Sequence, residues 1–299
     1  GFTYTYTLGS TTYTSTTATF TGLDLEQTYT VTVNYQAVSN TVTLLNEDFG
    51  VGTTATDAVK SPYIGEDWYF NKNTTESYST SNGKGQSKVH PANKYLDNQE
   101  YTIAPEFILN SNSNDWMKPV DKSGNANGRK LFIDGHATLT TEANLYLREI
   151  GVLPNQPLTF TTDFFNVISL AKTAAANNPI VQPQVRLQLY ESEKAFKDGN
   201  APLKQTNIYH VPAGSTTTAA DWKTQTLTLS STEVGNRTKL FAVIKMYNLQ
   251  HSGHDLAVDN IVITQKLSAC ATTVTATLTK ADVATPTLTL PANLSVICS

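Results

Sequence analysis

The sequence has little charge, few cysteines and almost no helical periodicity. Asp, Glu, Lys and Arg make up 15% of the 299 residues, against about 25% in typical soluble domains. Thr, Ser and Asn replace the missing charge, and Thr favours strands because its β-branched side chain fits a pleated surface. Apolar residues still account for 39%, so the chain can build packed cores. Its length favours two or three β domains.

These absences exclude several classes of function. The net charge is −4 and no basic stripe occurs, so nucleic-acid binding is not expected. No apolar run approaches the roughly 20 residues that span a membrane. Nucleophile-elbow, HExxH and P-loop motifs are missing, and we expect a protein that is not an enzyme. The sequence begins and ends within strand-like segments, which favours a piece of a longer modular chain.

Only two cysteines occur, Cys270 and Cys298. In a Thr-rich chain of low charge they indicate an oxidising compartment. A disulfide between them would contribute about 3 kcal/mol by closing a loop, and pairing of Cys298 with a cysteine outside this segment is equally open. Neither has the neighbouring His or CxxC partner that catalysis or metal binding requires.

Residues 1–43 have the pattern of a small β unit. Aromatic and Thr residues alternate over 2–8, and 17–20 and 28–33 predict two further strands. The unit resembles the SprB-type repeat of gliding-motility adhesins in Bacteroidetes. The resemblance rests on Tyr4 to Thr7, on the corner from Ala18 to Leu23, and on the T-Y-T-V-T-V run of residues 28–33.

Residues 44–266 predict one larger module, with regular structure sparse before residue 94 and a single turn of helix within 191–198. The predicted strands, including the one that leads into the module, are residues 42–45, 100–103, 130–133, 143–147, 158–165, 184–190, 222–229, 239–246 and 256–263. Many antiparallel strands in one module favour a jelly roll, which is a two-sheet sandwich.

The middle module resembles a jelly-roll domain of large Bacteroidetes surface proteins. It is more distantly similar to the cleaved-adhesin domains of gingipains and to jelly-roll carbohydrate-binding modules. The segments that carry the resemblance are 46–50, 60–64, 98–103, 121–131 and 253–261. The resemblance implies an extracellular role in adhesion or sugar contact.

Residues 267–299 predict a linker and the start of a third module. Residues 282–298 are similar to the opening of immunoglobulin-like HYR repeats, and Pro286 and Pro291 suit an entry or edge segment because proline cannot donate to a ladder. The expected fold class is therefore all-β, with tandem β-sandwich modules in which a central jelly roll is flanked by Ig- or fibronectin-like repeats.

A polar loop at residues 121–128 is a candidate calcium site. Asp121, Asn125 and Asn127 place oxygen atoms at alternating positions, and calcium takes six to eight oxygen ligands. Gly128 would permit a positive φ at the end of the loop. The alternative is an Asx-turn without metal. The jelly-roll resemblance adds further candidate ligands, namely Asp48, Asp259, Glu47 and Asp255.

Two tryptophans in polar segments, Trp68 and Trp116, are candidates for stacking on sugar rings. The alternative is core packing, because tryptophan is usually largely buried. With surface glycans as ligand and further modules of the same chain as partners, we expect a segment of an adhesin at the bacterial cell surface, serving attachment or gliding. The alternative function is a carbohydrate-binding module accessory to a secreted polysaccharide-degrading enzyme.

Overall fold

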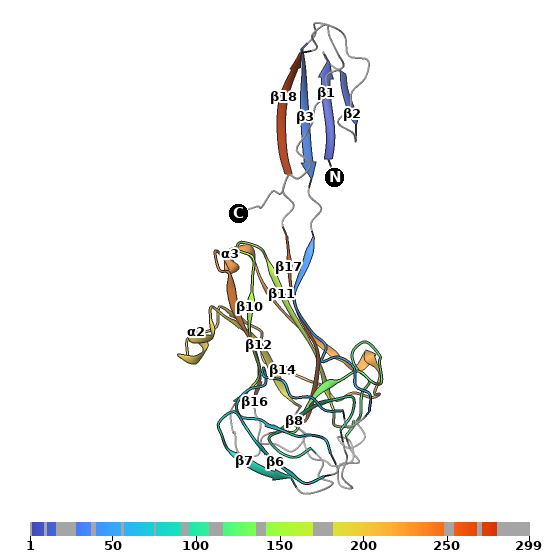
Figure 1. Cartoon of the computed structure of the whole chain (residues 1–299), viewed down its shortest axis with the longest axis vertical. Coiled ribbons are helices and arrows are strands. Elements are labelled where there is room, and N and C mark those ends of the chain that lie inside the picture. Colours follow the sequence, from blue (N-terminus) through green and yellow to red (C-terminus); the bar gives the residue numbers. More distant parts are fainter. Residues whose placement is uncertain are drawn as a thin grey trace. The chain divides into compact units, whose positions relative to one another are not determined.

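The computed structural model of the chain is all-β, with only two short α-helices among the described residues (Figure 1). This confirms the fold class predicted from the sequence. The structure describes residues 2–8, 11–15, 28–36, 40–54, 57–74, 76–90, 96–107, 116–135, 142–169, 182–247, 254–267 and 271–279. Two compact units are present: unit 1 comprises residues 1–42 and 266–299, and unit 2 comprises residues 43–265.

In unit 1 the described strands form one four-stranded antiparallel sheet in the order β18-β3-β1-β2. The strands are β1 (Phe2–Leu8), β2 (Thr11–Ser15), β3 (Thr28–Gln36) and β18 (Ala271–Thr279). The strand predicted at 17–20 lies outside the described residues, as do Cys270 and Cys298. Because β18 pairs with β3 over nine residue pairs, unit 2 is an insertion between two paired strands of unit 1.

Strand β18 changes the expected domain organisation. The sequence suggested a linker and the start of a separate module from residue 267 onward, whereas residues 271–279 complete the sheet of unit 1. The pairing was invisible in the sequence because β3 and β18 are separated by the whole of unit 2. The limits of unit 2, residues 43–265, lie within one residue of the expected 44–266.

Unit 2 is a sandwich of two sheets, with a small hairpin beside them. The seven-stranded sheet contains β4 (Thr41–Glu47), β5 (Tyr69–Phe70), β8 (Glu100–Ala104), β9 (Lys130–Ile133), β11 (Leu158–Asn166), β15 (Lys223–Leu229) and β17 (Leu256–Lys266). The five-stranded sheet contains β10 (Glu142–Gly151), β12 (Gln184–Tyr190), β13 (Lys204–Gln205), β14 (Tyr209–His210) and β16 (Lys239–Tyr247). Strands β6 (Tyr78–Ser81) and β7 (Ser87–His90) form the hairpin.

The main core lies between the two sheets of unit 2. Leu187 on β12 and Ile244 on β16 point inward from one sheet, and Phe160 and Phe164 on β11 point inward from the other; all four are fully buried. Apolar residues recur at alternate positions along most of these strands, as expected where one face of each sheet is covered. The alternation explains why the long strands could be predicted from the sequence.

A short helix covers part of the outer face of the five-stranded sheet. The helix α2 (Glu193–Lys197) begins at Ser192, whose hydroxyl accepts the backbone N–H of Ala195 at 3.1 Å. From α2, Phe196 packs against Tyr190 and Phe241 on the outer face of the five-stranded sheet. Two shorter elements border β15, the 3₁₀ helix η1 (Ala219–Asp221) and the helix α3 (Ser231–Val234). The strand edges that remain open leave room for binding sites.

The insertion predicts a fixed order of events when residues 1 and 299 are pulled apart. The β3–β18 ladder carries the load, so unit 1 should unfold first and unit 2 should feel force only afterwards. Single-molecule force spectroscopy should record a smaller extension followed by one of about 80 nm, because an extended residue spans about 0.36 nm. A step of about 80 nm that precedes every other event would contradict this order.

Candidate functional site

Four of the seven predicted calcium ligands line one pocket of about 350 Å³ in unit 2. They are Asp48, Asp121, Asn125 and Asp259, and they come from three segments far apart in the sequence. Asp48 follows β4, the loop 121–128 supplies the second and third residues, and Asp259 lies on β17. The fold therefore brings together oxygen-bearing side chains that the sequence could only list.

The loop 121–128 folds around the carboxylate of Asp121. Its Oδ1 accepts the hydroxyl of Ser123 and the backbone N–H of Asn125, each at 2.7 Å. A Cβ at residue 128 would lie 1.7 Å from Oδ2 of Asp121, so glycine is required there for close approach. The positive φ expected at Gly128 is found instead at Gly124, where φ is 91°.

Asp259 is held by a bulge in the pairing of β11 with β17. Its two carboxylate oxygens accept the backbone N–H groups of Lys122 and Asn260, each at 2.7 Å. Asn260 has a φ of 53°, as the extra residue of a bulge often does. Burial, together with the nearby negative charge of Asp121, raises the pKa of Asp259 to about 7. A bound cation would favour the ionised form of this carboxyl group.

The other three predicted ligands do not line the pocket. The carboxylate of Glu47 accepts the guanidinium of Arg148 at 3.4 Å, and the exposed Asn127 lies beyond the part of the loop that faces the pocket. Asp255, four residues before Asp259, accepts the backbone N–H of Gly135 at 3.1 Å. Neighbouring sequence positions on a strand point to opposite faces, which separates Glu47 from Asp48.

The oxygen atoms that line the pocket suit a hard cation such as calcium, although they do not converge on a single point. Carboxylate and amide oxygens are the ligands that calcium takes, and Asp48, Asp121 and Asp259 form no ion pair within 4 Å in the described part of the chain. In that part, no group of three or more His, Cys, Asp or Glu side chains converges tightly enough to hold a metal ion by itself. A calcium ion there would need backbone oxygens or water as additional ligands.

The structure corrects the role expected of Trp68. Its side chain is 2% exposed and its indole N–H donates to the carbonyl of Asn144 at 2.9 Å, so no ring face is open to a sugar. Trp116 is half-buried, packs edge-on against Phe107 and hydrogen-bonds the carboxylate of Asp255. Glu66 and Asp67, the polar neighbours of Trp68, lie in a turn, whereas the rings of both tryptophans pack against the protein.

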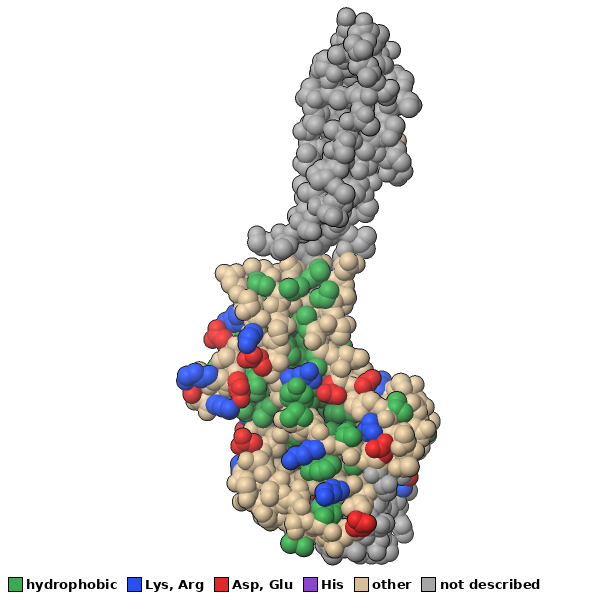
Figure 2. Space-filling model, viewed as in Figure 1, with side chains coloured by type: hydrophobic (Ala, Val, Ile, Leu, Met, Phe, Trp, Pro, Cys, Tyr) green, Lys and Arg blue, Asp and Glu red, His purple; other side chains and the backbone are tan. Residues whose placement is uncertain are grey.

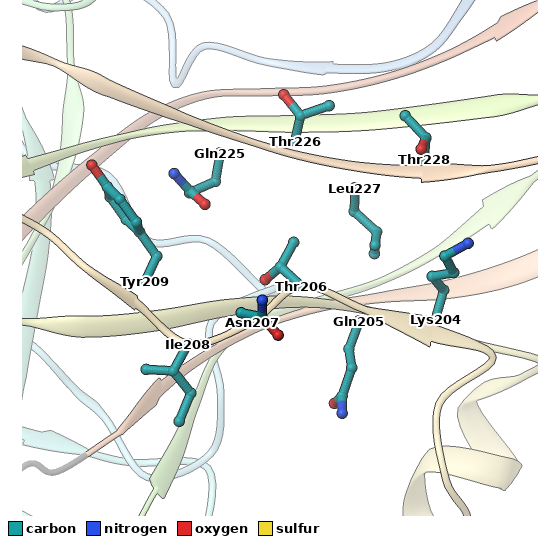
Figure 3. Close-up of a pocket in the computed structure, with 10 residues that line it drawn as sticks. All are labelled: Lys204, Gln205, Thr206, Asn207, Ile208, Tyr209, Gln225, Thr226, Leu227 and Thr228. Carbon is teal, nitrogen blue, oxygen red and sulfur yellow. The ribbon is translucent and has the colours of Figure 1, made fainter.

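A second pocket, an open groove of about 360 Å³, lies where the edges of the two sheets meet. One wall is the β13–β14 segment, residues 204–209, and the other is residues 225–228 of β15 (Figure 3). Tyr209 stands at one end of the groove with Gln225 beside it, and Lys204 lies at the other end. The floor contains Leu227, which is buried. We name this site the edge groove.

Neutral hydrogen-bonding groups dominate the edge groove. The amide and hydroxyl side chains that line it are Gln205, Thr206, Asn207, Gln225, Thr226 and Thr228. The charge of Lys204 is neutralised by an ion pair with Glu233, which keeps the pKa of that carboxyl low, at about 2. Sequence analysis missed the groove because its residues lie on two short strands and a Thr-rich edge, none of which forms a motif.

A pair of hydrogen-bonded carboxyl groups, Asp134 and Asp255, lies beside Trp116. Burial and mutual repulsion raise the pKa of Asp134 well above its usual range, and burial raises the pKa of Asp255 to about 6. Such a pair retains one proton at a pH where exposed carboxylates have lost theirs.

Comparison with known proteins identifies no family. No family model and no curated protein match the chain. Solved structures that align with it include a Stig cyclase from Fischerella sp. TAU bound to a pyrrolidinylidene-indole, at 14% identity over 76% of this chain and 98% of that chain, with a TM-score of 0.43.

Two carbohydrate-binding modules also align. One is TmCBM61 in complex with β-1,4-galactotriose, at 8% identity over 56% of this chain and 82% of that chain, with a TM-score of 0.28. The other, from the β-sandwich superfamily, is described as promiscuous in specificity, at 14% identity over 89% and 85%, with a TM-score of 0.30. At these scores the alignments support no statement about function.

The Asp134–Asp255 pair predicts a loss of stability as the pH rises. Both pKa values are higher in the folded state than in the unfolded chain, so the contribution to the free energy of unfolding is complete below about pH 4. It is lost as the pH rises through 6 and above. In thermal melts from pH 4 to 8, Asp134→Asn should flatten this dependence and raise stability at pH 8 by about 1–3 kcal/mol. Asp198→Asn, which changes an exposed carboxylate, should leave the dependence intact; a flattened profile in that control would contradict the assignment.

Proposed function

We propose that unit 2 is a non-catalytic carbohydrate-binding module and that it contacts its glycan in the edge groove. The observation that carries the proposal is the combination of an aromatic ring, Tyr209, with amide and hydroxyl groups along one open groove. Sugars offer hydroxyl groups that both donate and accept, and Gln, Asn and Thr side chains can do the same. An aromatic ring adds a flat apolar surface with a polar tip.

One face of unit 2 is suited to a neutral, hydrated ligand. The face of unit 2 in Figure 2 is mostly neither charged nor hydrophobic, and charged side chains of both signs are scattered over it. Ile208, in the groove wall, is 36% exposed, and its side chain points away from Gln225 and Leu227 (Figure 3). A shallow site of this kind suits part of a long polysaccharide, because each sugar makes a few contacts and the chain extends beyond the site.

We further propose that the whole protein is a cell-surface adhesin, in which unit 2 presents the glycan-binding groove. The topology supports this role, because the β3–β18 pairing keeps unit 2 off the path along which tension acts on the chain. A module in series with its neighbours would be stretched whenever the adhesin is loaded. The second candidate is a module that brings a secreted polysaccharide-degrading enzyme to its substrate. The mass of the native protein and its other domains distinguish the two.

Calcium is proposed as a stabilising ligand of unit 2. Asp48, at the end of β4, and Asp259, on β17, belong to strands that pair at the entry and exit of the unit. A cation shared by Asp48, Asp121 and Asp259 would join this pair of strands to the loop 121–128. Its effect would be to hold the ends of unit 2 together and to offset the repulsion among the carboxylates.

Replacing Tyr209 tests the glycan site. On an array of plant and microbial polysaccharides, Tyr209→Ala should weaken binding about tenfold, which corresponds to about 1.4 kcal/mol. Gln225→Ala and Asn207→Ala should each weaken it less, because single amides contribute only part of the contact. Val89→Ala removes an exposed apolar side chain on β7 and serves as the control. Equal binding by Tyr209→Ala and the unmodified chain would contradict the proposal that this groove binds the glycan.

Calcium titration tests the metal site and its ligand set. After chelation, added calcium should raise the free energy of unfolding, by about 2.7 kcal/mol when its concentration is 100 times the dissociation constant. Asp121→Asn and Asp259→Asn should abolish this gain. Asn127→Ala and Glu47→Gln should retain it, because neither side chain lines the pocket. The absence of any stabilisation at several millimolar calcium would rule out the site.

A further inference from the structure

The outer face of the five-stranded sheet carries an excess positive charge next to the edge groove. Arg186 on β12 and Lys245 on β16 are directly opposite each other in the strand register. Like charges in this position repel and destabilise a sheet unless something compensates them. Lys245 is compensated by Glu142, whose carboxylate lies 2.7 Å from its ammonium group.

Arg186 has no such partner. No described carboxylate lies within 4 Å of its guanidinium group, and its Nε is buried without a hydrogen-bond acceptor among the described residues. The cation lies 5.3 Å from the centre of the Tyr247 ring, which attracts it but does not neutralise it. Among the described residues, no carboxylate therefore compensates the charge of Arg186.

Gln205 connects Arg186 to the edge groove and fixes its position. The Nη1 of Arg186 donates to Oε1 of Gln205 at 3.3 Å, and Nε2 of Gln188 donates to the same oxygen at 2.8 Å. Gln205 also lines the groove. In Figure 3 the side chain of Gln205 points away from Gln225 and Leu227, toward the face that carries Arg186. A ligand that extends from the groove past residue 205 therefore comes to lie next to a guanidinium group that is already oriented.

We propose that Arg186 makes the edge groove selective for acidic saccharides, with the carboxylate of a uronic acid residue bound to its guanidinium group. The inference rests on the proposed glycan site and names its substrate class. A planar carboxylate matches the forked N–H donors of arginine, which it can bind in two places at once. It would also compensate the repulsion between Arg186 and Lys245. The neutral groove would bind the sugar ring, and Arg186 would bind the carboxylate of the uronic acid.

The test compares polyuronates with their methyl esters, which keep the sugar and remove the charge. Binding of the full chain to polygalacturonate, alginate and glucuronan, and to the three esters, is measured by calorimetry at low salt. We expect at least one acid form to bind about tenfold more tightly than its ester. Arg186→Gln should reduce the acid form to the affinity of the ester while leaving the ester unchanged.

Two further variants keep the test decisive. Lys194→Gln removes the same charge from an exposed position and should preserve the preference, which separates a specific contact from a change in net charge. Arg186→Lys should fold even if Arg186→Gln does not, and should retain only part of the preference because an ammonium group cannot bind a carboxylate through a planar fork.

The outcomes separate this inference from the proposed function. Equal affinity for acid and ester, with both weakened in Tyr209→Ala, would overturn the preference for acidic saccharides and leave the glycan site standing. A preference that survives Arg186→Gln would overturn the role of Arg186. No binding to any polysaccharide, acidic or neutral, would overturn the glycan site itself.

Discussion

The packing of the two sheets of unit 2 against each other is the interaction on which the other features depend. Each inward side chain, such as Phe160 or Leu187, is removed from water only because the opposite sheet covers it. Burying a side chain of this size contributes about 1.5–3 kcal/mol, and the gain must exceed the conformational entropy lost by both strands. Neither sheet could keep its inner face exposed, so the two form together.

This packing forces the polar chemistry to the rim of the sandwich. The interior accepts few polar groups, because an unpaired one costs free energy. The two pockets accordingly lie where strands end, bulge or lack a neighbour. Asp259 reaches its pocket through the bulge on β17, and the edge groove exists because β15 has a partner on only one side. The same irregularities that interrupt the sheets supply the candidate sites.

The sequence predicted the long strands of unit 2 well. Alternation of apolar and polar residues is local, so β11, β12, β16 and β17 could each be recognised without knowing their partners. Short strands such as β13 and β14 carry no periodicity and were missed, although they form one wall of the groove. The pairing of β18 with β3 was also missed, because register between distant segments is set by tertiary packing.

Candidate residues were predicted with mixed success for the same reason. Asp48, Asp121, Asn125 and Asp259 do line one pocket. Asp121 and Asn125 were predicted from the spacing of the loop, and Asp48 and Asp259 from the resemblance to jelly rolls. Glu47 and Asp255 do not line this pocket. Glu47 follows a different side-chain direction from Asp48, and Asp255 lies four residues before Asp259, whereas a list of acidic residues contains neither kind of information. The prediction for Trp68 was wrong for a related reason. Its sequence neighbours are polar, but the burial of the ring depends on where the side chain points.

The scarcity of charge gives weight to the few charges that lack a direct partner. Lys130 is fully buried near Asp121 and Asp259, and burial lowers its pKa to about 8. It is thus a weak counter-charge for three carboxylates, while the ammonium of Lys122 lies 3.2 Å from a different carboxylate, Asp163. On the outer face of the five-stranded sheet the imbalance has the opposite sign, at Arg186. Leaving these charges unpaired costs free energy of folding. A bound ligand of opposite charge would offset that cost.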